Sequence, residues 1–407
     1  MKKRNIPFSP PDIQEEDINR VVEVLKSGWI TTGPQTKAFE NEIASFSGTD
    51  KAVALSSCTA SLEMIMRVLG IGEGDEVIVP AYTYTATAAS VYHTGATIKM
   101  VDCNKGNFEM DYESLGNLIN EKTKAIIPVD IGGRPCNYNQ LYKIVESNKE
   151  VFSPNNNLQS AFNRIVIIAD AAHSFGAKYF NQKSGNIADF TCFSFHAVKN
   201  LTTGEGGAVT WKPNKLIDDE KLYQQLMLLS LHGQSKDALS KSKIGQWEYD
   251  VISPLYKCNM TDIQATLGRS QLQRYQDILD RRKDIINIYN RGIDDTFTEK
   301  MIHFESNITS SGHLYLLNIK GVNEDGRNEI IEKMALKGIS CNVHYKPLPL
   351  LTAYKEMGFN INDFPNAYSK FKNEITLPLN TKLTDEDLNF IIKSLNEVLE
   401  EVSEYYV

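Results

Sequence analysis

The sequence lacks most features of secreted, membrane-bound and metal-binding proteins. Its 407 residues include only six cysteines, none in a Cys-x-x-Cys pair, which disfavours zinc sites and dithiol redox chemistry. No apolar run approaches the roughly 18 residues of a membrane span. The basic N-terminus is not followed by the apolar stretch of a signal peptide. We therefore expect a cytoplasmic protein with reduced cysteines, no metal site and no membrane partner.

An excess of positive charge is absent as well. The formal net charge is -8, so general affinity for nucleic acid or for an anionic membrane surface is not expected. Three common ligand motifs are missing: a Walker A loop, a G-x-G-x-x-G turn after the first expected strand, and an H-E-x-x-H pair. A phosphorylated ligand would therefore need donors of another kind.

The patterns that are present indicate an α/β protein. Apolar residues recur at helical spacing in residues 18–25, 39–46 and 62–69. Short apolar and β-branched runs, which we expect to be strands, occupy residues 52–55, 76–79, 124–129 and 164–169. Strands that alternate with helices in this way predict a mostly parallel sheet covered by helices on both faces.

The chain is too long for one small core, so we expect two domains, residues 1–265 and 266–407. A long helical pattern after Asp262 is predicted to connect them. The second domain is expected to be a smaller α+β unit with strands near residues 314–317 and 339–343. The polar stretch 146–163 is interpreted as a surface insertion.

A lysine and an aspartate stand out among the charged residues. Lys199 lies among apolar and small residues just before the glycine-rich turn 204–207. Such surroundings neutralise an amine and make it nucleophilic. Asp170 ends an apolar run, where a carboxylate needs a partner. Together they suggest a pyridoxal-phosphate (PLP) site, in which the lysine forms a Schiff base and the acid faces the pyridinium nitrogen.

Two further segments fit this hypothesis. Residues 56–62 join an expected strand to a helix with small residues, so free amides and the helix dipole there favour a phosphate. The alternative is an ordinary helix cap made by Ser57 or Thr59. Tyr84 follows another strand, where an aromatic ring suits a planar cofactor. The alternative is a tyrosine packed against a loop.

Each remaining candidate also has an ordinary structural explanation. Asp170 could cap a helix, His173 could be a packed histidine, and Ser194 could be a strand serine without a role. Lys199 could face solvent, and Glu205 could be a turn residue. The order in which a phosphate turn, an aromatic residue, an aspartate and a lysine follow one another favours the cofactor site instead.

The sequence resembles the DegT-type sugar aminotransferases, PLP enzymes of the aspartate-aminotransferase fold (fold type I) that aminate keto sugars attached to nucleotides. The segments that carry the resemblance span nearly the whole chain: residues 28–34, 56–60, 74–80, 170–173, 194–200, 256–262 and 343–345. Some relatives that act as dehydratases have histidine at the lysine position, and Lys199 argues against that activity.

The resemblance implies a role for each matching residue. Lys199 would be the Schiff-base lysine, Asp170 the partner of the ring nitrogen, and His173 a neighbour of the ring's phenolic oxygen. The residues implied in cofactor binding are completed by Thr59, Ala60 and Ser194 at the phosphate, Tyr84 on the ring and Asn259 from a neighbouring subunit. The residues implied in substrate contact are Thr31, Thr32 and His344. A homodimer with shared active sites follows from the implied role of Asn259.

The resemblance also implies a substrate. Residues 195–200 look most like enzymes that aminate carbon 4 of a UDP-linked sugar, which predicts a 4-keto-6-deoxy sugar nucleotide with L-glutamate as amino donor, for a surface polysaccharide. Ala169 and Pro349 depart from common family residues. The alternatives are amination at carbon 3, another PLP enzyme of this fold, such as a desulfurase, and a PLP-binding regulatory homologue without turnover.

Overall fold

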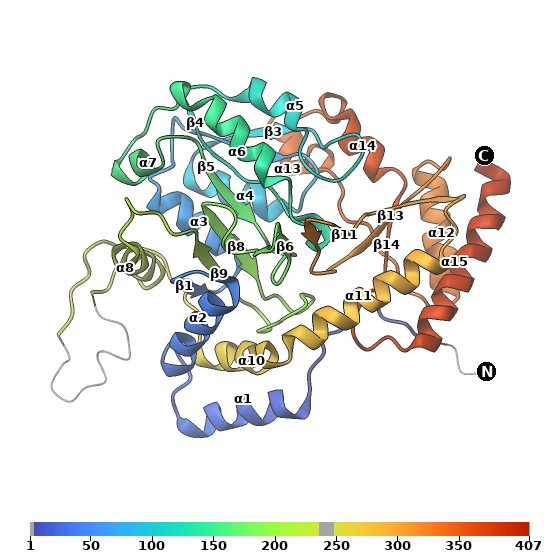
Figure 1. Cartoon of the computed structure of the whole chain (residues 1–407), viewed down its shortest axis with the longest axis horizontal. Coiled ribbons are helices and arrows are strands. Elements are labelled where there is room, and N and C mark those ends of the chain that lie inside the picture. Colours follow the sequence, from blue (N-terminus) through green and yellow to red (C-terminus); the bar gives the residue numbers. More distant parts are fainter. Residues whose placement is uncertain (1–3, 236–247, 407) are drawn as a thin grey trace.

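A seven-stranded sheet forms the centre of the larger part of the molecule (Figure 1). The computed structural model describes residues 4–235 and 248–406. Across the sheet the strand order is β1 (Ala52–Leu55), β9 (Gly207–Trp211), β8 (Phe190–Ser194), β5 (Val166–Asp170), β4 (Thr123–Ile126), β2 (Glu76–Pro80) and β3 (Thr97–Val101). Only β9 runs against the others, so the predicted mostly parallel sheet is confirmed.

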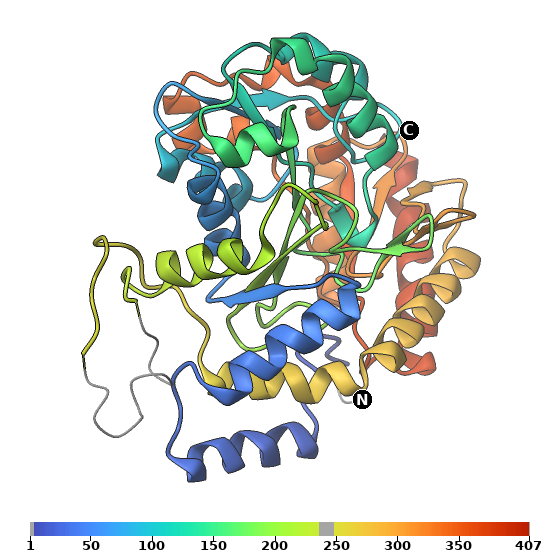
Figure 2. The same cartoon turned by 60° about the vertical axis from the view of Figure 1, so that its left-hand side comes forward.

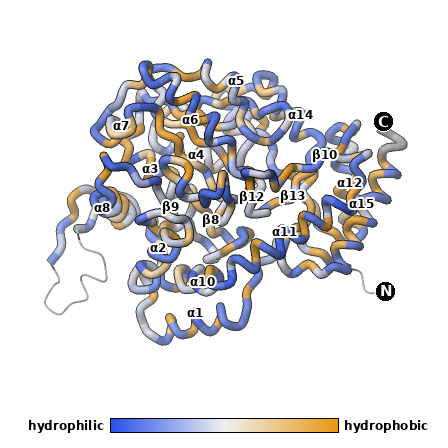
Figure 3. The backbone as a smooth tube through the Cα atoms, viewed as in Figure 1, coloured by the Kyte–Doolittle hydropathy of each residue, from blue (hydrophilic) through white to orange (hydrophobic). Residues whose placement is uncertain are grey.

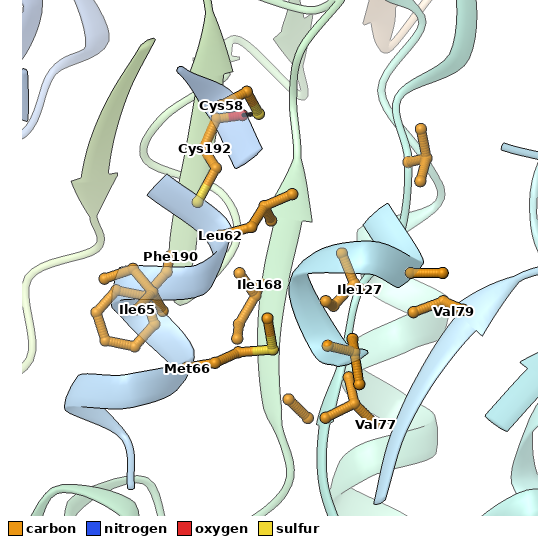
Figure 4. Close-up of a cluster of buried hydrophobic side chains, with 14 of the residues drawn as sticks. Cys58, Leu62, Ile65, Met66, Val77, Val79, Ile127, Ile168, Phe190 and Cys192 are labelled. Carbon is orange, nitrogen blue, oxygen red and sulfur yellow. Dashed lines mark hydrogen bonds between the residues drawn. The ribbon is translucent and has the colours of Figure 1, made fainter. Parts of the chain in front are cut away.

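The strands are buried on both faces of the sheet. Successive side chains of a strand point to opposite faces, and each face is covered by its own core layer. Ile167 and Ile168 are neighbours on β5 and enter opposite core layers. One layer contains Leu62 and Ile65 of α3, which pack onto the sheet (Figure 4). The other layer contains Phe39 of α2. Full burial on both sides explains why these strands are short continuous apolar runs.

The helices of the large sheet begin and end at recognisable signals. Gly28 ends α1 in the left-handed conformation (φ 76°), and Pro34 begins α2. The helices of this part are α1 (Glu15–Ser27), α2 (Pro34–Ser47), α3 (Cys58–Val68), α4 (Thr85–Thr94), α5 (Tyr112–Leu115), α6 (Tyr138–Ser147), α7 (Asn157–Phe162), α8 (Asp219–Ser230) and α10 (Asp262–Gln273). Helix α1 lies against α10 in both views (Figures 1 and 2).

A second core surrounds a three-stranded antiparallel sheet, drawn at the right of Figure 1. Its strands are β10 (Thr298–Lys300), β13 (Tyr315–Ile319) and β14 (Glu374–Leu377). The helices of this part are α11 (Tyr275–Gly292), α12 (Glu324–Leu336), α13 (Thr352–Glu356), α14 (Pro365–Phe371) and α15 (Asp385–Tyr406). Ile6 joins this core and bridges to Ile339, so the N-terminal segment packs with the C-terminal part of the chain.

The prediction of a strand at residues 339–343 is wrong. Ser340 donates its amide to Ile6, whereas Asn342 exchanges both backbone hydrogen bonds with Thr376 of β14. The segment thus makes isolated bridges to two different neighbours instead of a ladder with one. The strand predicted at residues 314–317 is confirmed as β13.

The polar stretch 146–163 is more than a surface insertion. It contains helix α7, which is capped by the Asn156 side chain. Gln159 is fully buried and donates from Nε2 to the Leu69 carbonyl at 2.7 Å. A second small sheet connects the two parts of the molecule through β11 (Phe304–Glu305), β12 (Ile308–Thr309), β6 (Lys178–Tyr179) and β7 (Gln182–Lys183).

The long C-terminal helix α15 is amphipathic. Hydrophobic and hydrophilic residues alternate along it (Figure 3), and Leu388, Ile391, Leu395, Val398 and Val402 form its buried stripe. Among the described helices, none combines the length and the apolar composition that crossing a bilayer requires.

Candidate active site

The carboxyl ends of four strands meet at one edge of the central sheet. Strands β1, β2, β5 and β8 run in the same direction and end at Leu55, Pro80, Asp170 and Ser194. Strand β9 runs the other way and starts at this edge, where Gly207 is the register partner of both Leu55 and Ser194. Ligands of parallel α/β sheets bind at this edge.

Asp170 is a buried carboxylate held by three donors. Its Oδ2 accepts the Thr87 hydroxyl at 2.7 Å, and its Oδ1 accepts the Ala172 amide at 3.2 Å and the Cys58 thiol at 3.7 Å. Burial raises the pKa of Asp170, while these donors and the charge of Lys199 oppose that rise. A carboxylate has about four acceptor positions, so one remains for a further donor.

Asp170 does not cap a helix, because turns follow it at residues 172–176. That alternative is therefore wrong. The carboxylate is instead oriented by contacts from α3 and α4, two elements that are distant in sequence from β5.

Lys199 lies in the turn after β8, where its amide donates to the His196 carbonyl at 2.9 Å. Burial lowers the pKa of its amine to about 8, against the opposing charge of Asp170. The side chain is still partly exposed, so a ligand can reach it. An amine with this pKa is unprotonated far more often than that of a surface lysine, and is nucleophilic in that form. Ser194, at the end of β8, is partly buried and accepts the His196 amide at 3.4 Å.

The N-terminus of α3 forms a close turn beside β9. Ser57 caps the helix by accepting the Ala60 amide at 3.0 Å, so the capping alternative holds for Ser57. The amides of Cys58 and Thr59 open the first turn and have no intrahelical acceptor. A Cβ atom on Gly207 would lie 2.3 Å from the Ser57 carbonyl carbon, so only glycine permits this approach. The turn has the geometry of an anion site.

His173 is buried and neutral. Its Nδ1 accepts the Gly132 amide at 3.2 Å, so the proton of the neutral ring is on Nε2, which lies 2.9 Å from the Tyr345 hydroxyl. Burial and the charge of Lys199 hold its pKa well below the usual range. The ring of His313 lies 4.4 Å away. His173 is therefore a packed histidine, as the structural alternative expects, whose polar edge faces the site.

Tyr84 and His344 are the two ring residues at the mouth of the site. Tyr84 precedes α4, is 59% exposed, and has its ring 5.8 Å from that of Tyr345. His344 stacks on Phe8 at 5.4 Å. Burial and the nearby charge of Lys199 lower the pKa of His344 to about 4.

The side chains of the remaining predicted residues form a group of their own beside the end of β1. The side-chain amide of Asn259 donates to the hydroxyl of Thr32, which is buried next to Thr31. Within the described parts of the chain, no hydrogen bond or ring contact joins this group to Lys199 or Asp170. The structure thus brings together eight predicted residues around the sheet edge. Asn259 also reaches this edge through its backbone, which bridges to Leu55 at the end of β1, whereas Thr31 and Thr32 lie beyond it.

Several residues at the site escaped the sequence prediction. Tyr345 lies inside a segment that carries the family resemblance and Thr87 lies outside all of them, but nothing in the spacing of either residue shows that Thr87 contacts Asp170 or that Tyr345 contacts His173. Glu374 and Thr376 gave no signal, because the alternation of residues 374–377 is that of a strand with one side in solvent, and only the structure shows that both polar side chains are buried.

The sequence matches the profile of the DegT/DnrJ/EryC1/StrS aminotransferase family over residues 11–396. The chain belongs to this family. The resemblance stated from the motifs is thereby confirmed. The matched residues span both parts of the structure, including the segments that carry Lys199 and His344.

Individual members of the DegT family are similar over their whole length. The spore coat polysaccharide biosynthesis protein SpsC of Bacillus subtilis is 36% identical over 412 residues, covering 98% of this chain and 99% of that protein. Spr1654 of Streptococcus pneumoniae, assigned as a sugar aminotransferase, is 52% identical in its PMP form with a TM-score of 0.95, covering 98% of this chain and 99% of the other. PseC of Helicobacter pylori, an aminotransferase involved in pseudoaminic acid biosynthesis, is 28% identical with a TM-score of 0.86, covering 98% and 100%.

As a DegT-family protein, the chain is a PLP-dependent sugar aminotransferase. The predicted fold type and cofactor are confirmed. The residues present fit that cofactor: Asp170 keeps an acceptor position for a ring N–H, Lys199 has a lowered pKa, and Gly207 leaves room at the anion turn.

Proposed function

We propose that Lys199 and Asp170 carry the chemistry of this aminotransferase. Bound pyridoxal phosphate supplies an electron sink for negative charge at the amino donor's α-carbon. Lys199 first anchors the cofactor and then moves the proton between that α-carbon and the cofactor's C4′. Asp170 keeps the ring nitrogen protonated. The observation that carries this assignment is the juxtaposition of a buried, donor-oriented carboxylate and a lysine whose pKa is lowered to about 8.

The neighbouring residues hold the cofactor in this proposal. Thr59 in the first turn of α3 and Ser194 at the end of β8 bind the phosphate through a free amide and hydroxyls, and Ala60, whose amide is held by the Ser57 cap, lines the same turn. Tyr84 stacks on the ring from the mouth of the site. The Nε2–H of His173, already directed at Tyr345, donates toward the phenolic oxygen.

We further propose that the substrate is a UDP-linked 4-keto-6-deoxy sugar, with a 2-acetamido group, aminated at carbon 4 with L-glutamate as donor. Residues 195–200 resemble enzymes with that position of attack. The similarity to PseC, named for pseudoaminic acid biosynthesis, supports a related sugar, and the similarity to SpsC supports a role in surface polysaccharide synthesis.

Regiochemistry is tested by supplying the holoenzyme with 4-keto and 3-keto UDP-sugars in parallel, each with L-glutamate. We expect one 2-oxoglutarate to form for each amine, with the amine on carbon 4 when the product is analysed by NMR. Amination only at carbon 3 would overturn the proposed position. Cofactor binding without turnover of either sugar would favour the regulatory homologue instead.

We also propose a homodimer in which Asn259, Thr31 and Thr32 complete the partner's site. Within one chain the Asn259 side chain contacts Thr32 and not Lys199, and the Asn259 backbone bridges to Leu55 at the end of β1. A polar group of this kind near a surface suits a two-fold arrangement in which each copy contributes these side chains to the active site of the other. Asn259 would then reach the phosphate held by α3 of the neighbouring copy.

Shared sites predict complementation between two inactive variants. Lys199→Ala removes the anchor, and Asn259→Asp places a carboxylate against the phosphate. A hybrid dimer keeps one site that neither substitution touches, so mixing equal amounts after subunit exchange should restore about a quarter of wild-type activity. The control mixes wild type with the double variant. If each site were built within one chain, the two single variants would restore nothing.

A further inference from the structure

A buried carboxylic acid lies behind His344 without a part in the proposed chemistry. Strand β14 alternates two core residues, Ile375 and Leu377, with two polar ones, Glu374 and Thr376. Side chains two apart lie on the same face of a strand. Glu374 and Thr376 are both fully buried, and they face the segment that carries His344.

Three contacts connect these residues in a closed ring. Glu374 Oε2 accepts the His344 backbone amide at 2.8 Å. Glu374 Oε1 lies 2.5 Å from the Thr376 hydroxyl, which lies 2.9 Å from Nδ1 of His344. Thr376 is fixed by its paired backbone hydrogen bonds with Asn342. The carboxyl group thus holds the backbone of His344 directly and its ring through one hydroxyl.

A hydroxyl has a single proton, so it donates to only one of its two neighbours. When Glu374 is a carboxylate, Thr376 donates to it and accepts the Nδ1 proton of His344, and Nε2 is left with a lone pair. When Glu374 is protonated, its O–H donates to Thr376, which turns its own proton toward Nδ1. The ring proton is then on Nε2.

We propose that Glu374 and Thr376 are positioning residues that decide which ring nitrogen of His344 carries the proton. His344 then offers the substrate an acceptor at Nε2 when Glu374 is ionised, and a donor at Nε2 when Glu374 is protonated. The consequence for the substrate rests on the proposed function, in which His344 contacts the sugar. The effect on the ring proton of His344 does not rest on the proposed function.

The ionisable groups around Glu374 allow such a change near neutral pH. Arg327 of α12 donates to the Glu374 backbone carbonyl at 3.5 Å, and Tyr82, Cys341 and Tyr345 are the other titratable groups that feel its charge. Burial raises the pKa of Glu374 to about 8, although its hydrogen bonds and Arg327 oppose the rise.

The ring of His344 stays neutral throughout this range, because burial and the charge of Lys199 lower its pKa to about 4. Raising the pH through the pKa of Glu374 therefore changes the tautomer and not the charge of His344. One proton leaves the carboxyl group for solvent. The ring gives up its Nε2 proton and gains one on Nδ1, so its own proton count is unchanged.

The tautomer is measured directly by NMR of the holoenzyme labelled with ¹⁵N-histidine. The chain has seven histidines, and a His344→Gln sample identifies the signals that belong to His344. Between about pH 6 and about pH 10, the wild-type proton should move from Nε2 to Nδ1. A tautomer that stays the same over this range would overturn the proposal.

Two conservative variants separate the relay from a merely structural role. In Glu374→Gln the side-chain carbonyl must accept the His344 amide, so its NH₂ group donates to Thr376 and fixes the proton on Nε2 at every pH. Thr376→Ser should keep the wild-type crossover, whereas Thr376→Val should abolish it. A crossover that persists in both Glu374→Gln and Thr376→Val would contradict the relay.

The keto-sugar assay distinguishes this inference from the proposed function. If the relay and the contact between His344 and the sugar both exist, the KM for the sugar changes with pH in wild type and is independent of pH in Glu374→Gln. If the tautomer changes and the KM does not, the relay stands and the proposed contact between His344 and the sugar fails.

Discussion

Replacing Lys199 by alanine should remove sugar amination almost completely. The variant loses both the cofactor anchor and the group that moves the proton, and general acid–base catalysis alone contributes on the order of 10²–10⁴-fold. Its visible absorption should also shift, because no Schiff base with the protein can form. Turnover of glutamate and the absorption spectrum, recorded on the same preparation, measure the two effects separately.

Two controls define the cause of that loss. Lys199→Arg keeps a positive charge beside Asp170 but cannot form a Schiff base, so it should be as inactive as the alanine variant. Lys221→Ala removes a lysine whose side chain is 82% exposed, and it should behave as wild type. Substantial turnover by Lys199→Ala would mean that another group moves the proton.

Asp170→Asn should produce the second largest loss. The amide has nearly the shape of the carboxylate and can still accept the Ala172 amide, but it has no charge to hold a protonated ring nitrogen. Removing one partner of a buried charged pair costs about 2–5 kcal/mol. At roughly 1.4 kcal/mol per tenfold, this corresponds to a rate loss of about 30- to 5,000-fold. Single-turnover kinetics with glutamate measures the loss in the first half of the reaction.

Asp130 supplies a matched control for Asp170. It is a buried carboxylate beyond the end of the neighbouring strand β4, where it accepts the hydroxyls of Ser174 and Tyr138. Asp130→Asn should lower stability through these lost interactions more than it lowers the rate per folded enzyme. Equal kinetic losses in the two variants would show that Asp170 acts only by supporting the fold.

The sequence was sufficient to predict the parts of the fold that depend on local pattern. The first strand was predicted at its observed bounds, residues 52–55, because four apolar residues are flanked by turn-forming ones. Gly28 and Pro34 are local signals of the same kind, since the first ends one helix and the second starts the next. These signals act within a few residues of the chain and need no tertiary information.

The errors lie where distant segments decide the structure. Residues 339–343 have the composition of a strand, but their backbone bonds go to Ile6 and Thr376, which lie far apart in the sequence. Gln159 is buried in a stretch that looked like surface, because the Leu69 carbonyl satisfies its amide. Composition cannot reveal partners of this kind.

The candidate site shows the same division. Lys199 and Asp170 were found because an isolated charge in an apolar segment is a local signal. Thr87, which orients Asp170, is one of several similar threonines in residues 83–87, and only the fold selects it. The proposed role of Glu374 depends on one direct contact with His344, 30 residues away in the chain, and on a second through the Thr376 hydroxyl.

The most direct test of the site is to find the lysine that carries the cofactor. The holoenzyme is reduced with borohydride, digested, and analysed by peptide mass spectrometry. We expect the reduced cofactor to be attached to the peptide that contains Lys199, and to be absent from every peptide of the Lys199→Arg variant. Attachment to a different lysine, or no attachment in an active holoenzyme, would contradict the assignment of Lys199.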